Sequence, residues 1–292
     1  MTEAAKGLDI HRLAGSLGAE VRGLSLASAG AGEADRIKGL LLEHLVLFFP
    51  DQHLSPDEHI AFGRLFGQLE AHPNLGLDAE RPEFFELRAE SGGGAIADEW
   101  HSDLSCQASP SQLAILQMKT CPQVGGDTLW ANMYKAFEAL TPPMQALCEG
   151  LSALHDASPH GHPERKAIHP VVRVHPETGR KSLFVNEHFT RRIVELSHDE
   201  SEMLLAHLTR FVASPRFTVR YRWSAGTIAM WDNRCTQHHV LDDFEGARVI
   251  QRVTVMGDAP KPAVPSRWSP YRDAFSAGSW RDMALWKFLR EG

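Results

Sequence analysis

The spacing of apolar residues in the N-terminal part of the chain predicts two helices separated by a strand. Apolar residues repeat with helical spacing over residues 33–45, which places Leu40 and Leu41 on one buried face. The apolar run at 45–49 is typical of a short buried strand. Ser55 precedes a proline and two acidic residues, which together predict a helix start.

The remainder of the chain is dominated by short strands. We expect strands at residues 111–118, 217–223, 226–231 and 248–255, and helices at residues 133–150, interrupted by two prolines, and 198–212. Residues 71–99 and 155–170 are expected to form loops. Because strands and helices do not alternate as βαβ units, a doubly wound sheet is disfavoured, and a mainly β jelly roll or barrel with added helices fits better.

We expect one domain, residues 1–258, followed by a C-terminal extension over residues 259–292. Large apolar side chains follow Ser279, so the extension is predicted to be helical and to pack on its own domain or on a second subunit. A homo-oligomer, either a dimer or a tetramer, is therefore expected.

Composition excludes several classes of protein. Hydrophobic residues make up 43% and charged residues 23%, which excludes an intrinsically disordered chain. The net charge of −7 argues against a nucleic-acid partner, and no apolar run is long enough to span a membrane. The four cysteines form no CxxC pair and no secretory signal is visible, so a cytoplasmic location is expected.

Histidine is unusually frequent, with 16 residues, and it is the commonest metal ligand. A single His-x-Asp triplet, His101 and Asp103, could hold a metal from one side of a strand, although a surface pair in a loop is an equally good interpretation. Most other histidines, including His59, His160 and His169, are expected to be solvated.

A second motif, residues 231–238, follows a predicted strand and ends at His238. Two histidines and one carboxylate from distant segments are the ligands of a facial Fe(II) site, which leaves three positions open. A lone histidine here would more often be a satisfied core residue.

Arginines after this motif add weight to a functional site. Arg248 and Arg252 share one face of their predicted strand. A hairpin would pair that strand with the segment of His238 and bring an arginine close to this histidine. Buried arginines need anionic partners, which could be two acidic ligands or internal carboxylates. Thr128, after a Gly-Gly turn, offers a hydroxyl to a carboxylate.

Taken in order, these motifs resemble the Fe(II)/2-oxoglutarate-dependent dioxygenases of the taurine dioxygenase (TauD/TfdA) type, from about residue 8 to residue 260. The resemblance rests on residues 100–103, 125–133, 169–193, 231–238 and 248–258. It implies a double-stranded β-helix, a jelly roll, with flanking helices. It also implies Fe(II) as the metal, 2-oxoglutarate as co-substrate and O₂ as oxidant.

The resemblance assigns roles to individual residues. His101, Asp103 and His238 would be the iron ligands, and Thr128 and Arg248 would bind the distal carboxylate of 2-oxoglutarate. Three further residues would contact substrate: Arg252, His72 and Phe189. The reaction implied is hydroxylation of a small anionic substrate (a sulfonate, sulfate ester or carboxylate) with release of succinate and CO₂.

Departures from taurine dioxygenase concentrate around the expected substrate pocket. They include Ala97, Leu75, Ala157, Leu104 and Cys106. Alternatives are taurine dioxygenase proper, a jelly-roll binding protein that has lost catalysis, and a zinc hydrolase using the same ligands. The zinc hydrolase leaves the two arginines and the Gly-Gly turn without a role.

Overall fold

The computed structural model describes residues 7–71, 80–90 and 98–271. Its largest element is a seven-stranded sheet, in the order β1-β2-β3-β13-β5-β15-β4. The bounds of these strands are β1 Asp9–Arg12, β2 Ala19–Arg22, β3 Val46–Phe49, β13 Ile228–Asp232, β5 Leu113–Thr120, β15 Arg248–Val255 and β4 Phe84–Ala89. Apart from the parallel β2–β3 pair, the strands in this sheet are antiparallel.

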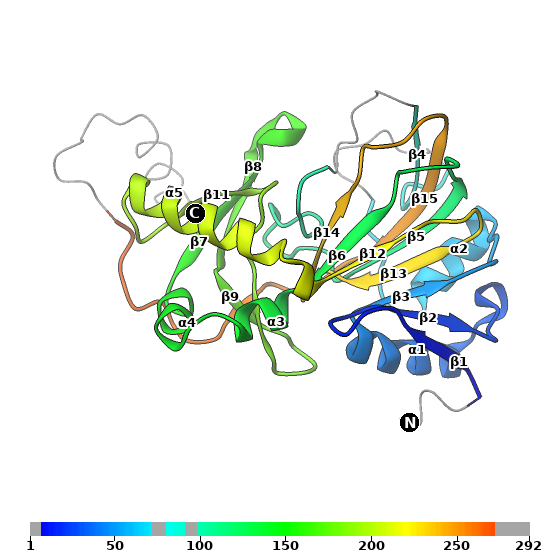
Figure 1. The fold of residues 1–292 in the computed structure, drawn as a ribbon, viewed down its shortest axis with the longest axis horizontal. Helices are drawn as coiled ribbons and strands as arrows, with labels where there is room; N and C mark the ends of the chain where they lie inside the picture. Colours follow the sequence, from blue (N-terminus) through cyan, green and yellow to red (C-terminus); the bar gives the residue numbers. More distant parts are fainter. Residues whose placement is uncertain (1–6, 72–79, 91–97, 272–292) are drawn as a thin grey trace.

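A smaller sheet lies against part of the large one and completes the jelly roll (Figure 1). Its strands are β12 Thr218–Tyr221, β6 Thr128–Asn132 and β14 Thr236–Val240, in the order β12-β6-β14. Alternating side chains fill both faces of the large sheet. In β3, Phe48 packs against Trp130 between the two sheets, whereas Leu47 and Phe49 join the core on the opposite face.

Helices cover that opposite face, as the spacing predicted. The first is α1 Ala31–His44, and the second, α2 Pro56–Arg64, begins at Ser55, whose hydroxyl accepts a hydrogen bond from the Glu58 backbone amide. Leu40 and Ile60 of these helices pack into the core beneath the sheet. The continuous run at β3 is therefore apolar because both of its faces are buried.

The other end of the molecule is built from helices and two three-stranded sheets (Figure 1). One sheet contains β11 Thr190–Ile193, β7 Ser152–Ala157 and β8 His162–Pro170; the other contains β10 Lys181–Leu183, β9 Val172–Val174 and β16 Lys261–Pro262. The helices here are α3 Met133–Glu138, α4 Pro142–Cys148 and α5 His198–Val212. Short 3₁₀ turns occupy Leu26–Ser28, Ser158–His160 and Pro215–Phe217. The expected break at the two prolines is confirmed, because Pro142 begins α4.

Two of the predicted loops contain strands. Residues 155–170 fall largely in the β7–β8 hairpin, in which Ser152 pairs with Pro170. Pro163 and Pro170 are tolerated because β8 is an edge strand with one unpaired side. Within 71–99, β4 pairs with β15 at the edge of the large sheet.

The predicted pairing around His238 is also wrong. β14 pairs with β6, whereas β15 lies between β5 and β4 in the large sheet. The segment between β14 and β15 therefore crosses from one sheet to the other instead of forming a hairpin.

The mainly β jelly roll is confirmed. No helix within the described ranges is long and apolar enough to cross a membrane. The division at residue 258 stays a prediction. β16 pairs with β9 beyond that boundary, and the helix expected after Ser279 lies outside the described residues.

Candidate active site

Three expected metal ligands meet between the two sheets. His101 and His238 form an antiparallel bridge through both of their backbone amides, at 3.0 and 2.8 Å. Asp103 lies two residues further along, and its Oδ1 is 4.0 Å from His101 Nε2 and 3.8 Å from His238 Nε2. All three side chains are buried. Three donor atoms from two distant segments therefore face a common point.

The protonation states of these residues suit a cation. Burial lowers the pKa of His101 to about 4 and that of His238 well below its ordinary value. Burial alone would raise the pKa of Asp103, but the positive charge of Arg252 and the neighbouring imidazoles hold it well below its usual range. Two neutral imidazoles and one carboxylate can bind a metal without first losing protons.

Surrounding groups fix the orientation of the ligands. His101 Nδ1 donates a hydrogen bond to the Glu99 carbonyl oxygen at 2.7 Å, which leaves Nε2 for a metal. The ring of His238 packs against Trp231, with centroids 4.7 Å apart. The second carboxylate oxygen of Asp103 forms an ion pair with Arg252 at 2.8 Å. This donor set fits Fe(II), the metal of facial sites made of two histidines and one carboxylate.

A second buried cluster also brings metal-binding residue types together. His175, Asp232 and Cys235 have donor atoms within 4.8 Å of one another. Asp232 is already occupied, because Arg234 contacts both of its oxygens at 2.9 and 2.7 Å and His175 Nε2 donates to Oδ2 at 3.0 Å. His175 must donate there because its Nδ1 accepts from two backbone amides.

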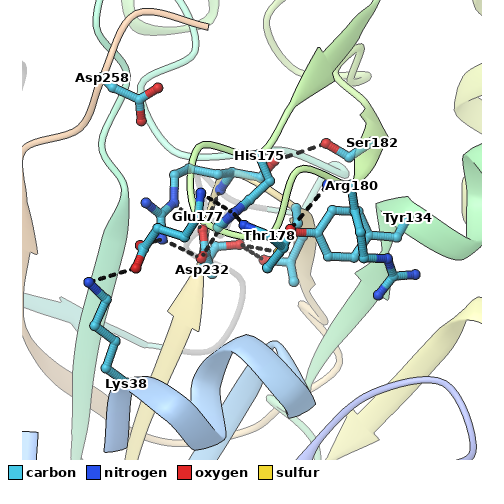
Figure 2. A network of polar contacts seen from close by, with 12 residues as sticks. Lys38, Tyr134, His175, Glu177, Thr178, Arg180, Ser182, Asp232 and Asp258 are labelled. Carbon is cyan, nitrogen blue, oxygen red and sulfur yellow. Dashed lines mark hydrogen bonds and ion pairs between the residues drawn. The ribbon is translucent and has the colours of Figure 1, made fainter. Parts of the chain in front are cut away.

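This cluster continues outward as a chain of ion pairs. Arg234 also pairs with Glu177 at 3.0 Å, and Figure 2 shows Lys38 of α1 reaching the same carboxylate, at 2.6 Å. The chain stabilises the turn from β13 to β14 and thereby the strand that carries His238. The arginine leaves this cluster unsuited to a cation.

A cavity of about 360 Å³ contains the three candidate ligands and extends along the space between the sheets. Thr128 and Arg248 line it, as do Arg252 and Phe189. Arg248 and Arg252 are four residues apart on β15, which corresponds to roughly 13 Å along the strand. The cavity thus has one arginine beside the ligands and another well away from them.

Arg248 is the arginine that lies far from the three candidate ligands, and its side chain can bind an anion. It is only 5% exposed, and its Nε has no hydrogen-bond partner within the described part of the chain. Burial lowers its pKa to about 10 because no carboxylate of the described residues compensates it. Thr128 Oγ1 accepts from Trp223 Nε1 at 2.9 Å, which leaves its hydroxyl proton for another acceptor.

The Gly-Gly turn lies beside Arg248, because a Cβ on Gly126 would be 3.4 Å from Arg248 Cδ. A Cβ on Gly125 would lie 2.1 Å from the Asp243 carbonyl oxygen, and both glycines have positive φ. The Gly126 amide donates to Asp243 Oδ1 at 2.9 Å. The turn therefore requires glycine for packing against the segment that leads to Arg248.

The predicted substrate residues have different outcomes. Arg252 and Phe189 line the cavity, and His72 lies outside the described residues. The expected proximity of an arginine to His238 holds, but Arg252 arrives from the opposite sheet. The alternative of an internal salt bridge applies to Arg252, which pairs with Asp103, and does not account for Arg248.

Several cavity residues were missed from the sequence. Phe85 and Leu87 come from β4, which had been assigned to a loop. His160 is partly exposed and lines the cavity, whereas His169 is 3% exposed, so the expectation that His169 is solvated is wrong. The signal for His169 is the alternation of buried residues in β8, which the prolines obscure.

Comparison with known proteins gives a consistent result. The profile of the family described as "Taurine catabolism dioxygenase TauD, TfdA family" matches residues 9–254. The chain is 35% identical over 277 residues to an alpha-ketoglutarate-dependent sulfate ester dioxygenase of Pseudomonas putida, covering 87% of this chain and 91% of that protein. It is 36% identical over 274 residues to an alkylsulfatase of Acinetobacter baylyi, covering 86% of each.

A solved structure of a taurine dioxygenase from Burkholderia xenovorans is also similar. It superposes with a TM-score of 0.81 at 33% identity, over 92% of this chain and 97% of that one. These similarities make the protein a 2-oxoglutarate-dependent dioxygenase. The chain belongs to the TauD/TfdA family of dioxygenases.

Proposed function

We propose that the substrate is an alkyl sulfate ester and that the enzyme cleaves its C–O bond oxidatively. Hydroxylation of the carbon that bears the sulfate oxygen would use O₂ and 2-oxoglutarate and release succinate and CO₂. The hydroxylated ester would then collapse to an aldehyde, sulfate and a proton, which balances the reaction. Similarity to the sulfate ester dioxygenase of Pseudomonas putida and to the alkylsulfatase of Acinetobacter baylyi supports this substrate class.

The observation that carries the proposal is the position of Arg252. Its guanidinium lies 2.8 Å from the carboxylate of Asp103, at the metal end of a cavity whose lining is mainly apolar. A guanidinium binds oxyanions such as sulfate through a planar fork of N–H donors. An anionic head there would place an adjacent carbon close to the proposed metal, with an apolar tail in the remaining space.

We assign the remaining roles as follows. His101, Asp103 and His238 would hold Fe(II), which together with 2-oxoglutarate supplies the oxidising power of the reaction. Thr128 and Arg248 would bind the distal carboxylate of 2-oxoglutarate and so set its orientation. His72 and Phe189 would complete the substrate side.

Partners and location belong to the same proposal. A homo-oligomer is supported by exposed apolar side chains near the end of the described chain, at Trp268 and Tyr271. Four free cysteines support a cytoplasmic enzyme, and the net charge of −7 supports the absence of a nucleic-acid partner. No membrane partner is proposed.

A succinate-release assay with Fe(II) and 2-oxoglutarate tests the substrate class. The panel contains n-alkyl sulfates, alkanesulfonates including taurine, and aryloxyalkanoates. We expect stoichiometric succinate, sulfate and aldehyde from the alkyl sulfates. Turnover of sulfonates or aryloxyalkanoates with no turnover of any alkyl sulfate would refute the proposed substrate.

A further inference from the structure

Two histidines from separate segments meet at the edge of the cavity. His160 ends the 3₁₀ turn between β7 and β8, and His188 lies between β10 and β11. Their Nε2 atoms are 3.2 Å apart, and both side chains line the cavity. The contact therefore joins the tip of the β7–β8 hairpin to the loop before β11, across the edge of the space proposed for substrate.

His188 is held firmly relative to the metal ligands. Its side chain is 7% exposed, and its Nδ1 donates to Glu99 Oε2 at 2.8 Å. The backbone carbonyl of the same Glu99 accepts from His101 Nδ1. The rings of His101 and His188 are 5.5 Å apart. One residue thus orients both a candidate metal ligand and one side of the histidine contact.

His160 is fixed from the hairpin side. Its ring stacks on Phe189, with centroids 5.6 Å apart and an interplanar angle of 27°. Asp156 of β7 accepts from Arg191 Nε at 2.8 Å, which ties the hairpin to the segment of Phe189. The position of His160 is therefore set by packing and by an ion pair beyond the cavity.

The contact lies away from the proposed co-substrate position. His188 and Phe189 are grouped around His101, whereas Arg248 is four residues along β15 from the residue that pairs with Asp103. The histidines therefore border the part of the cavity left for the substrate beyond its anionic head.

We propose that His160 and His188 form a specificity-determining wall that limits the length of the substrate's tail. This inference rests on the proposed function, because it takes the anionic head to lie at Arg252. Each imidazole satisfies the other's Nε2, so neither Nε2 atom is left for a polar group of the tail. A tail that outgrows the space has to break this hydrogen bond.

Three variants of His160 test the wall. Two of them should shift the preferred tail length in opposite directions, and the third should leave it close to that of the wild type. His160→Ala removes the ring and should move the optimum of kcat/KM along a series from butyl to dodecyl sulfate towards longer tails. The gain should be about fourfold for each methylene that becomes buried. His160→Trp enlarges the wall and should move the optimum to shorter tails. His160→Gln retains a donor near His188 and should stay close to the wild-type profile.

His162→Ala is the matched control on the same hairpin. Its imidazole contacts Glu164 at 3.1 Å outside the cavity, so the wild-type profile should be retained. An unchanged tail profile in both the alanine and tryptophan variants of His160 would overturn the inference, as would an equal shift in His162→Ala.

Failure of the proposed function gives a different result. If the wild type accepts sulfonates or carboxylates instead of sulfates, the same tail series is built on that head group. The shift in preferred tail length between the variants then tests the wall independently of the head group.

Discussion

Replacing Arg248 by methionine is expected to weaken 2-oxoglutarate binding while leaving the free protein as stable as before or more stable. The side chain is 5% exposed, and its pKa is lowered to about 10 by burial without a compensating carboxylate among the described residues. A buried unpaired charge costs several kcal/mol, and an apolar residue of similar volume removes that cost. Affinity and stability should therefore change in opposite directions.

The loss of affinity can be estimated from the contacts expected in the complex. Hydrogen bonds to charged groups contribute about 1.5–3 kcal/mol each, so two bonds to a carboxylate give roughly 3–6 kcal/mol. That corresponds to a factor of about 10² to 10⁴ in Kd. Thr128 remains in the variant, which places the expected loss towards the lower end.

Thermal unfolding with Mn(II) in place of Fe(II) measures both effects without turnover. At a 2-oxoglutarate concentration about 100 times its Kd, the wild type should gain about 2.7 kcal/mol, or a rise in Tm of roughly 5–10 °C. Arg248→Met should show almost none of this rise at the same concentration, with a Tm without 2-oxoglutarate no lower than that of the wild type. Arg222→Met, at an exposed arginine directly after β12, is the control and should retain the full rise.

Either of two results would refute this reasoning. A full 2-oxoglutarate-induced rise in Arg248→Met would show that the co-substrate carboxylate binds elsewhere. A loss of several kcal/mol of stability without 2-oxoglutarate would show that a protein group, not a ligand, balances the charge of Arg248.

Three further predictions concern the ligands and the buried histidines. His101→Ala should abolish Fe(II)-dependent succinate release; full activity in this variant would exclude the assigned metal centre. Arg252→Ala should raise KM or remove substrate-dependent turnover while the 2-oxoglutarate-induced rise in Tm persists, and an unchanged KM for every accepted substrate would contradict its role. Burial lowers the pKa of His59 to about 4, below the value of roughly 6.5 in the unfolded chain, so stability is lost as pH falls from about 6.5 towards 4. In His59→Gln, the slope of unfolding free energy against pH in that window, measured by urea unfolding, should fall by up to about 1.4 kcal/mol per pH unit, and an unchanged slope would show that His59 has the same pKa in the folded and unfolded states.

The spacing of residues was sufficient to predict an element where apolar or capping residues dominated it. The α1 face, the Ser55 helix start and β15 could be identified because their apolar or capping residues follow regular spacing. The β7–β8 hairpin could not, because its buried positions include His155 and His169 and its prolines imitate a loop. These histidines are satisfied by Ser105 and by backbone carbonyls from another segment, which sequence spacing does not reveal.

The candidate site residues could be predicted from the sequence, whereas the strand pairing that brings them together could not. Order and residue type single out His101, Asp103 and His238 as candidate ligands, and the structure brings them together, whereas the hairpin predicted to bring an arginine to His238 is wrong. A hairpin from β14 to β15 is the simplest local solution, but a jelly roll requires consecutive strands to change sheets. Arg252 consequently reaches Asp103 across the gap between the sheets, and the site depends on the packing of both.

Some site residues lie on paired strands and others on connecting segments. This difference determines which substitutions can alter substrate preference. Both candidate histidine ligands and both arginines are tied to paired backbone: His101 bridges to His238, and Arg248 and Arg252 lie on β15, whose neighbours fix its register. Shifting any of them by one residue would turn its side chain to the opposite face and destroy the site. The His160–His188 wall belongs instead to a hairpin tip and a loop, where a substitution alters one contact and leaves the ladders intact. We therefore expect that substitutions at the hairpin tip change which substrate tails are accepted with little effect on the reaction. Substitutions along β15 should impair the reaction itself.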